Sequence, residues 1–586
     1  MYDISYSSNF ATNFVTSSLF LILILSNSFL ISSIIQKKNI KLFSNSLPIV
    51  IFFLFFLFFS FVFNILLIFN ANKLLIFFFY FALALSIFLS LINVRYFINT
   101  ISKKNVFSLE KDKSTKFILL VLFIFYLITI LPISDADSLA LHQYFATYIF
   151  KNGLTDLDII KYFEFSLFTN SEILLLFSPM LKSDNFGSQL NFFTLVIFFI
   201  LFPKKKNFFL FLVSCPLIIF FISTQKLQLF FSILFLLLFI LVHKKLIKNK
   251  IEIFIFTLLI LFYISGKLSY ILIGGPLFIY FLILNKQNYK FIIFASFISL
   301  LFTLFPIFFL KSYYFGNPFL PFFDSYFNDR SIMDAFSLSV RSSEGWLFNF
   351  KDLKIFIKPF VPLTLSGLSG SLGLIFLITL FNLSLIRSVY YLPLIIIILV
   401  LFTGQILPRY YFEAFLILIF FFNYNDKKLV KYALFLQLFV ILSLSISFVF
   451  IAYVNENVLM NKSKYMNRFS YSYFNSTELE KLNITDNVLA FSLDRNSIFI
   501  EENFYPTRYI NSMNLINKNK NKNIINYIME NSIKYIIIRD VQKIPKCFSV
   551  LKVDEIYQKK SIRNFLIKNK KNIFNVYKIN NNRCGT

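Results

Sequence analysis

The stretch "SLPIVIFFLFFLFFSFVFNILLIFN" (46–70) decides the fold class, because it contains no charged side chain along its whole length. An α-helix needs about 20 apolar residues to cross the roughly 30 Å hydrocarbon core of a bilayer. The rest of the chain has the same character: of its 586 residues, 58% are hydrophobic and 87 are phenylalanine. This composition is far from that of soluble domains, and it predicts an α-helical polytopic membrane protein.

Apolar runs of this kind recur along the chain and predict about fourteen transmembrane helices. The first run has neither a basic segment before it nor a small-residue cleavage site, so we expect it to stay in the protein as a helix. The expected spans are 12–35, 46–70, 74–97, 117–132, 187–203, 207–222, 227–243, 251–265, 268–285, 290–310, 366–386, 388–406, 410–425 and 431–453.

The net charge of +28 comes largely from lysines in the short loops between these runs, such as 204–206 and 244–250. Such loops are typical of the cytoplasmic side of a membrane protein, so we expect no nucleic-acid partner and expect membrane lipids as the surroundings. Placing every basic loop in the cytoplasm puts both termini and three long polar segments on the outer side. These segments are 133–186, 311–365 and 454–586.

The sequence therefore predicts three regions. Residues 1–116 form N-terminal extra transmembrane helices, 117–453 form a transmembrane core with the outer loops 133–186 and 311–365, and 454–586 form a small extracytoplasmic α/β domain. In this last region strands are expected at 487–493, 497–502, 533–540, 548–553 and 572–579, with a helix at 522–531.

Three cysteines occur in the chain. Cys215 lies inside an apolar run, where it is expected to pack as a small apolar residue. Cys547 and Cys584 lie in the polar tail and could pair if that tail faces an oxidising compartment.

The stretch "ILPISDADSLALHQYF" (130–145) places Asp135 and Asp137 directly after an apolar span. One interpretation is that one carboxylate caps the amphipathic helix expected at 138–150, which would lie on the membrane surface, while the other is solvated. The other is that both act chemically, by binding Mg²⁺ or Mn²⁺ or by taking a proton from an acceptor hydroxyl. No Walker loop, GxGxxG, HExxH or CxxC motif occurs, so nucleotide-driven transport and zinc hydrolysis lack their usual residues.

Four stretches in order carry a resemblance: "LPISDADS" with the following "LHQYFATYIFKNG", "GKLSY" (266–270), "YYFGNPFLPFF" (313–323) and "LPRYYFEAFL" (407–416). Together they resemble the C-type integral-membrane glycosyltransferase superfold (GT-C). This superfold contains the protein mannosyltransferases, the aminoarabinose transferases of lipid A and the oligosaccharyltransferases. The resemblance covers roughly 117–453.

The resemblance implies an inverting hexosyl- or pentosyltransferase of the bacterial inner membrane. Its donor is a sugar on a polyprenyl phosphate, and its acceptor is a glycan, lipid or protein on the outer side. Carried over, Asp135 is the first candidate for the catalytic base or metal ligand and Asp137 is the second.

The lipid phosphate of such a donor needs cations at the membrane surface. Arg409 and Lys267 are the best candidates, because a guanidinium fork suits phosphate and because a lysine between apolar half-spans is costly unless it faces a cavity or partner. Arg409 also fits an ordinary interfacial residue. Tyr270 and Tyr410 belong to the same two motifs and are expected to contribute to substrate binding.

Four further residues have open interpretations. Lys226 in "STQKLQ" has a position similar to that of Lys267 but fits a plain loop residue. His142 is a candidate for substrate binding, although a single histidine is more often structural. Glu164 and Glu172 could complete a metal site or hold an acceptor.

Other functions remain open. A polysaccharide polymerase or ligase of the O-antigen type is also polytopic, but it is expected to use basic outer-loop residues, and the paired acids favour a glycosyltransferase. A transporter or flippase would predict midplane charges and an internal repeat, which the sequence lacks. A structural or assembly protein would use the tail to bind a partner.

Overall fold

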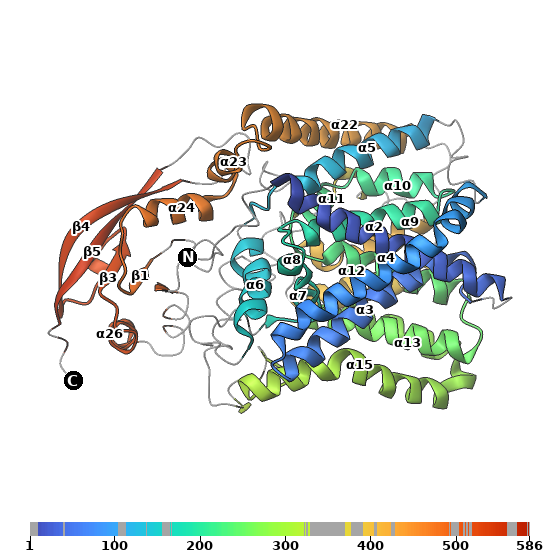
Figure 1. Cartoon of the computed structure of the whole chain (residues 1–586), viewed down its shortest axis with the longest axis horizontal. Helices are drawn as coiled ribbons and strands as arrows, with labels where there is room; N and C mark the ends of the chain where they lie inside the picture. Colours follow the sequence, from blue (N-terminus) through green and yellow to red (C-terminus); the bar gives the residue numbers. More distant parts are fainter. Residues whose placement is uncertain are drawn as a thin grey trace.

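The computed structural model describes residues 10–38, 42–103, 113–135, 137–154, 165, 167–320, 323, 326–327, 370–376, 389, 391–403, 407–422, 428–491, 493, 503–507, 510, 514, 519–559, 571–582 and 584. It consists of a helical bundle and a small C-terminal domain beyond one end of that bundle (Figure 1). We call this end of the bundle the domain end.

Long apolar helices build the bundle, as the composition predicts. Among the described residues, five helices are long and apolar enough to cross a membrane: Phe14–Lys37, Leu47–Ile68, Lys113–Ile130, Lys286–Phe315 and Lys428–Asn455. The bundle helices are α2 (Phe10–Lys37), α3 (Leu47–Ile68), α4 (Asn72–Lys103), α5 (Lys113–Ile130), α9 (Phe186–Leu201), α10 (Lys206–Val213), α11 (Pro216–Ile222), α12 (Gln228–His243), α13 (Lys250–Ser265), α14 (Ile271–Leu284), α15 (Tyr289–Phe315), α20 (Tyr391–Phe402), α21 (Phe412–Phe421) and α22 (Lys428–Phe450).

One expected span, 207–222, is wrong as a single helix. The structure divides it into α10 and α11, with the break at Ser214 and Cys215. Pro216 is the first residue of α11, and a proline cannot donate the backbone hydrogen bond that a continuous helix needs there. Cys215 is buried, as expected. Most of 366–386, and most of the loop expected at 311–365, lie outside the described residues.

The lysine-rich segments that directly precede α10 and α13 lie at the end of the bundle opposite the domain end (Figure 1). Lys205, before α10, donates from Nζ to the carbonyl of Phe420 near the end of α21 at 3.3 Å. The backbone N of Phe43, before α3, donates to Oε1 of Glu252 at the start of α13 at 3.0 Å. Helices far apart in sequence therefore begin or end together, as the loop charges predict.

The N-terminal helices belong to the same core as the rest of the bundle. Asn170 connects α3 to it: its Oδ1 accepts hydrogen bonds from Ser60 Oγ (2.7 Å) and Asn64 Nδ2 (2.8 Å). Its Nδ2 donates to Ser265 Oγ (2.7 Å) and to the carbonyl of Thr303 (3.0 Å). The buried apolar cluster is continuous across the boundary expected at residue 116.

The helix expected at 138–150 exists, but it does not lie on a surface. A π-helical turn, η2 (Ser138–His142), leads directly into α6 (Gln143–Asn152). Both faces of α6 are buried, and the ring of Phe145 stacks on that of Phe168 at 5.2 Å. The polar residues between the apolar ones make the helix look amphipathic in the sequence, but Gln143 and Thr147 are buried as well.

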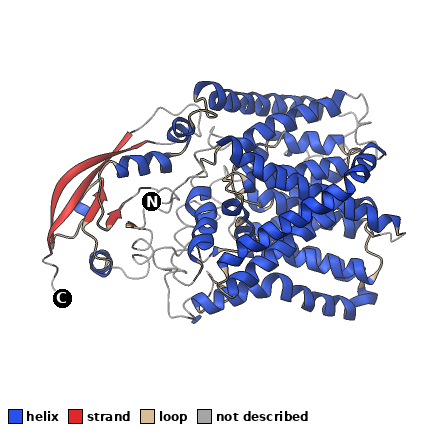
Figure 2. Ribbon diagram, viewed as in Figure 1, coloured by secondary structure: helices blue, strands red, loops and turns tan. Residues whose placement is uncertain are grey.

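The C-terminal domain is a five-stranded sheet with a helix on each face (Figure 2). The strand order is β2-β1-β3-β5-β4; β1 is parallel to β2 and β3, whereas β5 is antiparallel to β3 and β4. The strands are β1 (Val488–Ala490), β2 (Phe504–Pro506), β3 (Tyr535–Ile538), β4 (Phe548–Lys559) and β5 (Lys571–Asn582).

Side chains alternate between the two faces of this sheet. Leu489 and Ile536 pack towards α26 (Lys520–Glu530), whereas Ala490 and Ile537 face the side of α24 (Tyr471–Glu480). The α/β prediction is confirmed for four strands and the helix. The strand expected at 497–502 lies outside the described residues, and the three-residue β2 is too short to show an alternating pattern.

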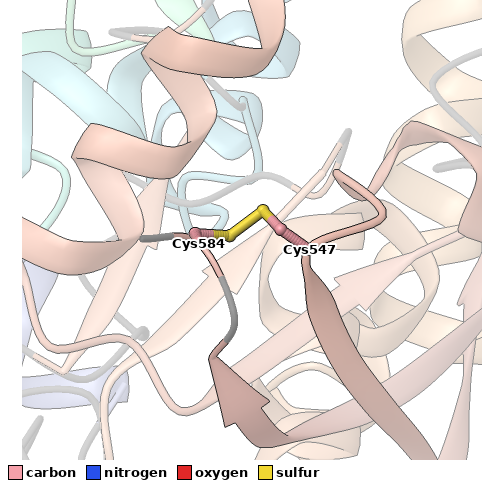
Figure 3. The surroundings of a disulfide bond; sticks show 2 residues. All are labelled: Cys547 and Cys584. Atoms are coloured by element: carbon pink, nitrogen blue, oxygen red, sulfur yellow. A yellow bond between two sulfur atoms is a disulfide. The ribbon is translucent and has the colours of Figure 1, made fainter. Parts of the chain in front are cut away.

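Two features define the limits of this domain. The preceding helix α23 (Lys462–Phe469) packs into the bundle core, so the change in packing comes near residue 470 rather than at 454. At the C-terminus, Cys547 before β4 and Cys584 after β5 form a disulfide with a Cα–Cα distance of 4.9 Å (Figure 3).

Candidate functional site

Five short segments converge at the domain end of the bundle: 135–142, 169–172, 223–228, 266–270 and 407–410. They are joined by hydrogen bonds, an ion pair and a cation–ring contact. All seven site residues expected from the sequence lie on these segments. They are Asp135, Asp137, His142, Lys267, Tyr270, Arg409 and Tyr410.

Asp135, the first catalytic candidate from the sequence, has the geometry of a helix cap. Its Oδ2 accepts hydrogen bonds from the backbone N of Ser138 (3.1 Å) and from Ser138 Oγ (2.7 Å). Its side chain is buried at the start of η2. A carboxylate that satisfies the first free amide groups of a helix stabilises that helix end.

Asp137 has the opposite surroundings, because its side chain is 64% exposed. Its Oδ2 forms an ion pair with Nζ of Lys226 at 2.6 Å. The Lys226 ammonium lowers the pKa of Asp137 well below its usual range, and Arg409 and His142 act in the same direction. Asp137 is therefore an ionised, accessible carboxylate among positive charges.

The segment 223–228, between α11 and α12, connects the acidic loop to the arginine motif. The backbone N of Gln225 donates to Ser138 Oγ at 3.0 Å, next to the Asp135 cap. Three residues later, Gln228 Nε2 donates to the carbonyl of Arg409. This short loop thus fixes the distance between two motifs that are far apart in sequence.

Lys226 itself is held firmly at the centre of that loop. Asn191 on α9 donates from Nδ2 to the carbonyl of Lys226 (2.7 Å) and accepts at Oδ1 from the backbone N of Phe230 (2.9 Å). The Lys226 ammonium lies 5.2 Å from the ring centre of Phe220, and only 13% of its side chain is exposed.

Lys267, Arg409 and Tyr410 form a second cationic group beside it. Lys267 Nζ lies 4.5 Å from the Tyr410 ring centre, and Arg409 Nη2 donates to Tyr410 Oη at 3.2 Å. Burial lowers the pKa of Lys267, and repulsion from Arg409 and Lys226 lowers it further.

Tyr270 lies beneath these charges rather than among them. Its ring is buried and stacks on Tyr263 of α13, with 4.7 Å between ring centres. Next to this pair, the buried carboxylate of Glu413 accepts a hydrogen bond from Ser232 Oγ at 2.8 Å and interacts electrostatically with Lys267. In this arrangement Tyr270 supports the site and does not line it.

His142 is paired with a carboxylate. Its Nδ1 lies 3.0 Å from Oε1 of Glu172, whose Oε2 accepts a hydrogen bond from the backbone N of Thr169 at 2.8 Å. Burial would raise the pKa of Glu172, but the hydrogen bonds from His142 and Thr169 lower it. Thr169 Oγ1 also donates to the carbonyl of Gly266, the residue before Lys267, at 2.7 Å.

The two aspartates expected to bind a metal both have protein partners in this structure. Asp135 Oδ2 is occupied by Ser138, and Asp137 Oδ2 by a lysine. Within the described part of the chain, no group of three or more His, Cys, Asp or Glu side chains could hold a metal ion. Glu164, a possible further ligand, lies outside the described residues.

Sequence reasoning missed or undervalued four charged residues. Lys226 looked like a plain loop residue, and Glu413 was not considered. Lys311, also not considered, is fully buried near the end of α15 and donates from Nζ to the carbonyl of Leu320 at 2.7 Å. A signal did exist for Glu172, because Thr169 and Glu172 have the spacing of a capping box.

No protein-family model, no curated protein and no solved structure matches this chain. A functional assignment therefore rests on the geometry of the site and on the expectation that follows from the sequence motifs.

Proposed function

We propose that the protein is a membrane glycosyltransferase of the GT-C type. It moves a sugar from a polyprenyl-phosphate donor to a glycan, lipid or protein acceptor. The observation that carries the proposal is the exposed Asp137 carboxylate beside the cations Lys226, Lys267 and Arg409, at one end of membrane-length helices.

The chemistry requires both kinds of charge in one place. The acceptor hydroxyl oxygen attacks the anomeric carbon, and the bond from that carbon to the phosphate oxygen breaks, with its electron pair going to the phosphate. Asp137 takes the hydroxyl proton, and the cations stabilise the negative charge that builds on the departing lipid phosphate. Asp135 holds the helix that presents Asp137. No divalent cation takes part in the steps described here.

We further propose that about fourteen spans cross the inner membrane of a bacterial cell, with the basic loops in the cytoplasm and the C-terminal domain outside that membrane. The lysine-rich loops at the end of the bundle opposite the domain end support this orientation. The disulfide between Cys547 and Cys584 supports an oxidising compartment for the domain.

The test uses the full-length protein reconstituted in lipid nanodiscs with a panel of polyprenyl-phosphate sugars and envelope extracts as acceptors. Mass spectrometry follows the loss of the lipid-linked sugar and the gain of its mass on an acceptor. We expect transfer by the wild type and almost none by Asp137→Asn. If no donor in the panel is consumed although the protein is folded, the proposal fails.

One observation favours a second candidate. A group of three cations also fits the diphosphate of a polyprenyl-linked glycan, which is the donor of a polymerase or ligase. Polyprenyl-diphosphate glycans therefore belong in the same panel, and consumption of these alone would favour the second candidate.

A further inference from the structure

We propose that Lys226 keeps Asp137 in a resting ion pair and that the phosphate of an arriving lipid donor exchanges with it, so that the carboxylate becomes free only when the donor is bound. This inference deepens the proposed function and rests on it. It assigns Lys226 two roles in sequence: it is first the partner of the base and then a ligand of the donor phosphate.

The two partners differ in a way that suits such an exchange. Lys226 is 13% exposed and fixed from its backbone by Asn191, whereas Asp137 is 64% exposed and lies at the start of η2. When a competing anion reaches this pair, the carboxylate can turn towards water by a change of its own side-chain rotamer. The ammonium stays in place because its loop is held.

The charge balance of the group favours an additional anion. Lys226, Lys267 and Arg409 are close enough that Lys226 and Arg409 both disfavour the charged form of Lys267. Asp137 interacts with Lys226 and Arg409, and Glu172 interacts with Lys267 from its own buried position. A phosphodiester carries one full negative charge with two acceptor oxygens, so it can contact Lys226 and a neighbouring cation together.

The exchange has a chemical benefit for the reaction. A carboxylate held by an ammonium is a weak base, because the opposite charge stabilises its ionised form. When the donor phosphate replaces the carboxylate as the partner of the ammonium, Asp137 becomes a stronger base at the moment when an acceptor can be used.

The experiment measures the accessibility of Asp137 directly and needs no turnover. The full-length protein in nanodiscs is treated with a water-soluble carbodiimide and an amine tag, and labelling of Asp137 is quantified by peptide mass spectrometry. The probe is the methyl ester of polyprenyl phosphate, a phosphodiester that has the lipid and the charge of the donor but no sugar to transfer. Binding of the probe is measured separately by native mass spectrometry. Dimethyl phosphate serves as the soluble form of the same group.

In the wild type we expect the probe to raise labelling of Asp137 about tenfold, because removal of a nearby cation raises the pKa of a carboxyl by about one unit or more. Lys226→Gln should label at the high rate without the probe and should not respond to it. The matched control is Lys462→Gln. Lys462 pairs with Asp184 at 2.9 Å near the same end of the bundle. The exposed fraction of the Lys462 side chain is close to that of Lys226. This variant should behave like the wild type at Asp137.

Three outcomes would overturn the inference, and they differ in what else they affect. If the probe binds but labelling of Asp137 stays low, only the exchange fails. If the probe does not bind at all, the proposed donor fails together with the exchange. If dimethyl phosphate acts at the same concentration as the lipid probe, the anion is a soluble phosphate and not a lipid donor.

Discussion

The two polar regions of the molecule, the site at the domain end and the C-terminal domain, use their charges differently. In the domain, ion pairs such as Lys534–Asp486 and Lys552–Glu555 are exposed on both partners. At the site, Lys226 and Lys267 are largely buried and stand beside Arg409 and an accessible Asp137. Exposed pairs are well solvated and contribute little. Crowded, partly buried cations are costly unless they have a ligand, so we expect ligand binding at the bundle end rather than in the domain.

The strongest test of this difference removes one carboxylate from each region. Asp137→Asn should lower sugar transfer by roughly 10²- to 10⁴-fold, because it removes the proton acceptor but keeps the shape of the side chain. Asp486→Asn, in the exposed pair with Lys534, should leave transfer unchanged. Transfer is measured by mass spectrometry on equal amounts of membrane-inserted protein. Equal losses in both variants would remove the distinction between the regions.

The next test concerns stability inside the bundle. Asn170→Ala should lower the free energy of unfolding by about 3 kcal/mol, because it leaves buried partners on α3, α13 and α15 without hydrogen bonds. The control is Asn285→Ala, which removes one bond to the carbonyl of Phe281 in its own helix. Thermal unfolding in detergent compares the two. A loss no larger than that of the control would show that α3 is not held through Asn170.

The domain should depend on its disulfide. Replacing Cys547 and Cys584 by Ser should lower the local opening free energy of β4 and β5 by about 2 kcal/mol, because the bond restrains the unfolded hairpin. Amide hydrogen exchange in the full chain measures this. Exchange in the bundle should not change, and Cys215→Ala should not affect the hairpin. Destabilisation of the bundle would mean that the two regions are coupled more tightly than their separate cores indicate.

The pH dependence of transfer tests the surroundings of Asp137. A base works in its ionised form, so activity is present above its pKa and is lost as the pH falls through it. Because Lys226 depresses this pKa, kcat/KM of the wild type should persist to unusually low pH. In Lys226→Gln the acid limb should move upward by about one pH unit. If the acid limb of the pH profile does not move, Lys226 does not control the pKa of the catalytic base.

The smallest expected effect distinguishes the role of Asp135 from that of Asp137. Asp135→Ala should cost about 1 kcal/mol of stability through loss of the cap, whereas Asp135→Ser should retain most of it. Both variants should transfer sugar at rates much closer to the wild type than Asp137→Asn does. Loss of transfer in Asp135→Ser as severe as in Asp137→Asn would make Asp135 the catalytic group.

The sequence predicted the helices better than their surroundings. An apolar run gives the position of a helix because this signal depends only on local composition. In the described part of the chain, nearly every expected span contains a helix. The break before Pro216 and the burial of α6 were missed for different reasons. The first is a local backbone effect within a continuous apolar run, and the second depends on tertiary packing around the helix.

At the site, the sequence named residues on segments that the structure brings together, but it did not determine their contacts. It ranked Asp135 before Asp137, although only the hydrogen bonds to Ser138 and the contact with Lys226 distinguish a cap from an accessible carboxylate. It treated Lys226 as a loop residue, because its partner lies on a distant segment and no spacing rule connects them.

The amino-acid sequence by itself determined the apolar helices, the common end of the basic loops, the α/β tail and the segments on which charged residues follow an apolar run. These properties are local, since they depend on composition and on periods of two or 3.6 residues. Only the tertiary structure decided that α3 joins the core through Asn170, that Cys547 pairs with Cys584, and that Asp137 stands among Lys226, Lys267 and Arg409. These depend on distances between segments far apart in the chain, which packing sets and local pattern does not encode.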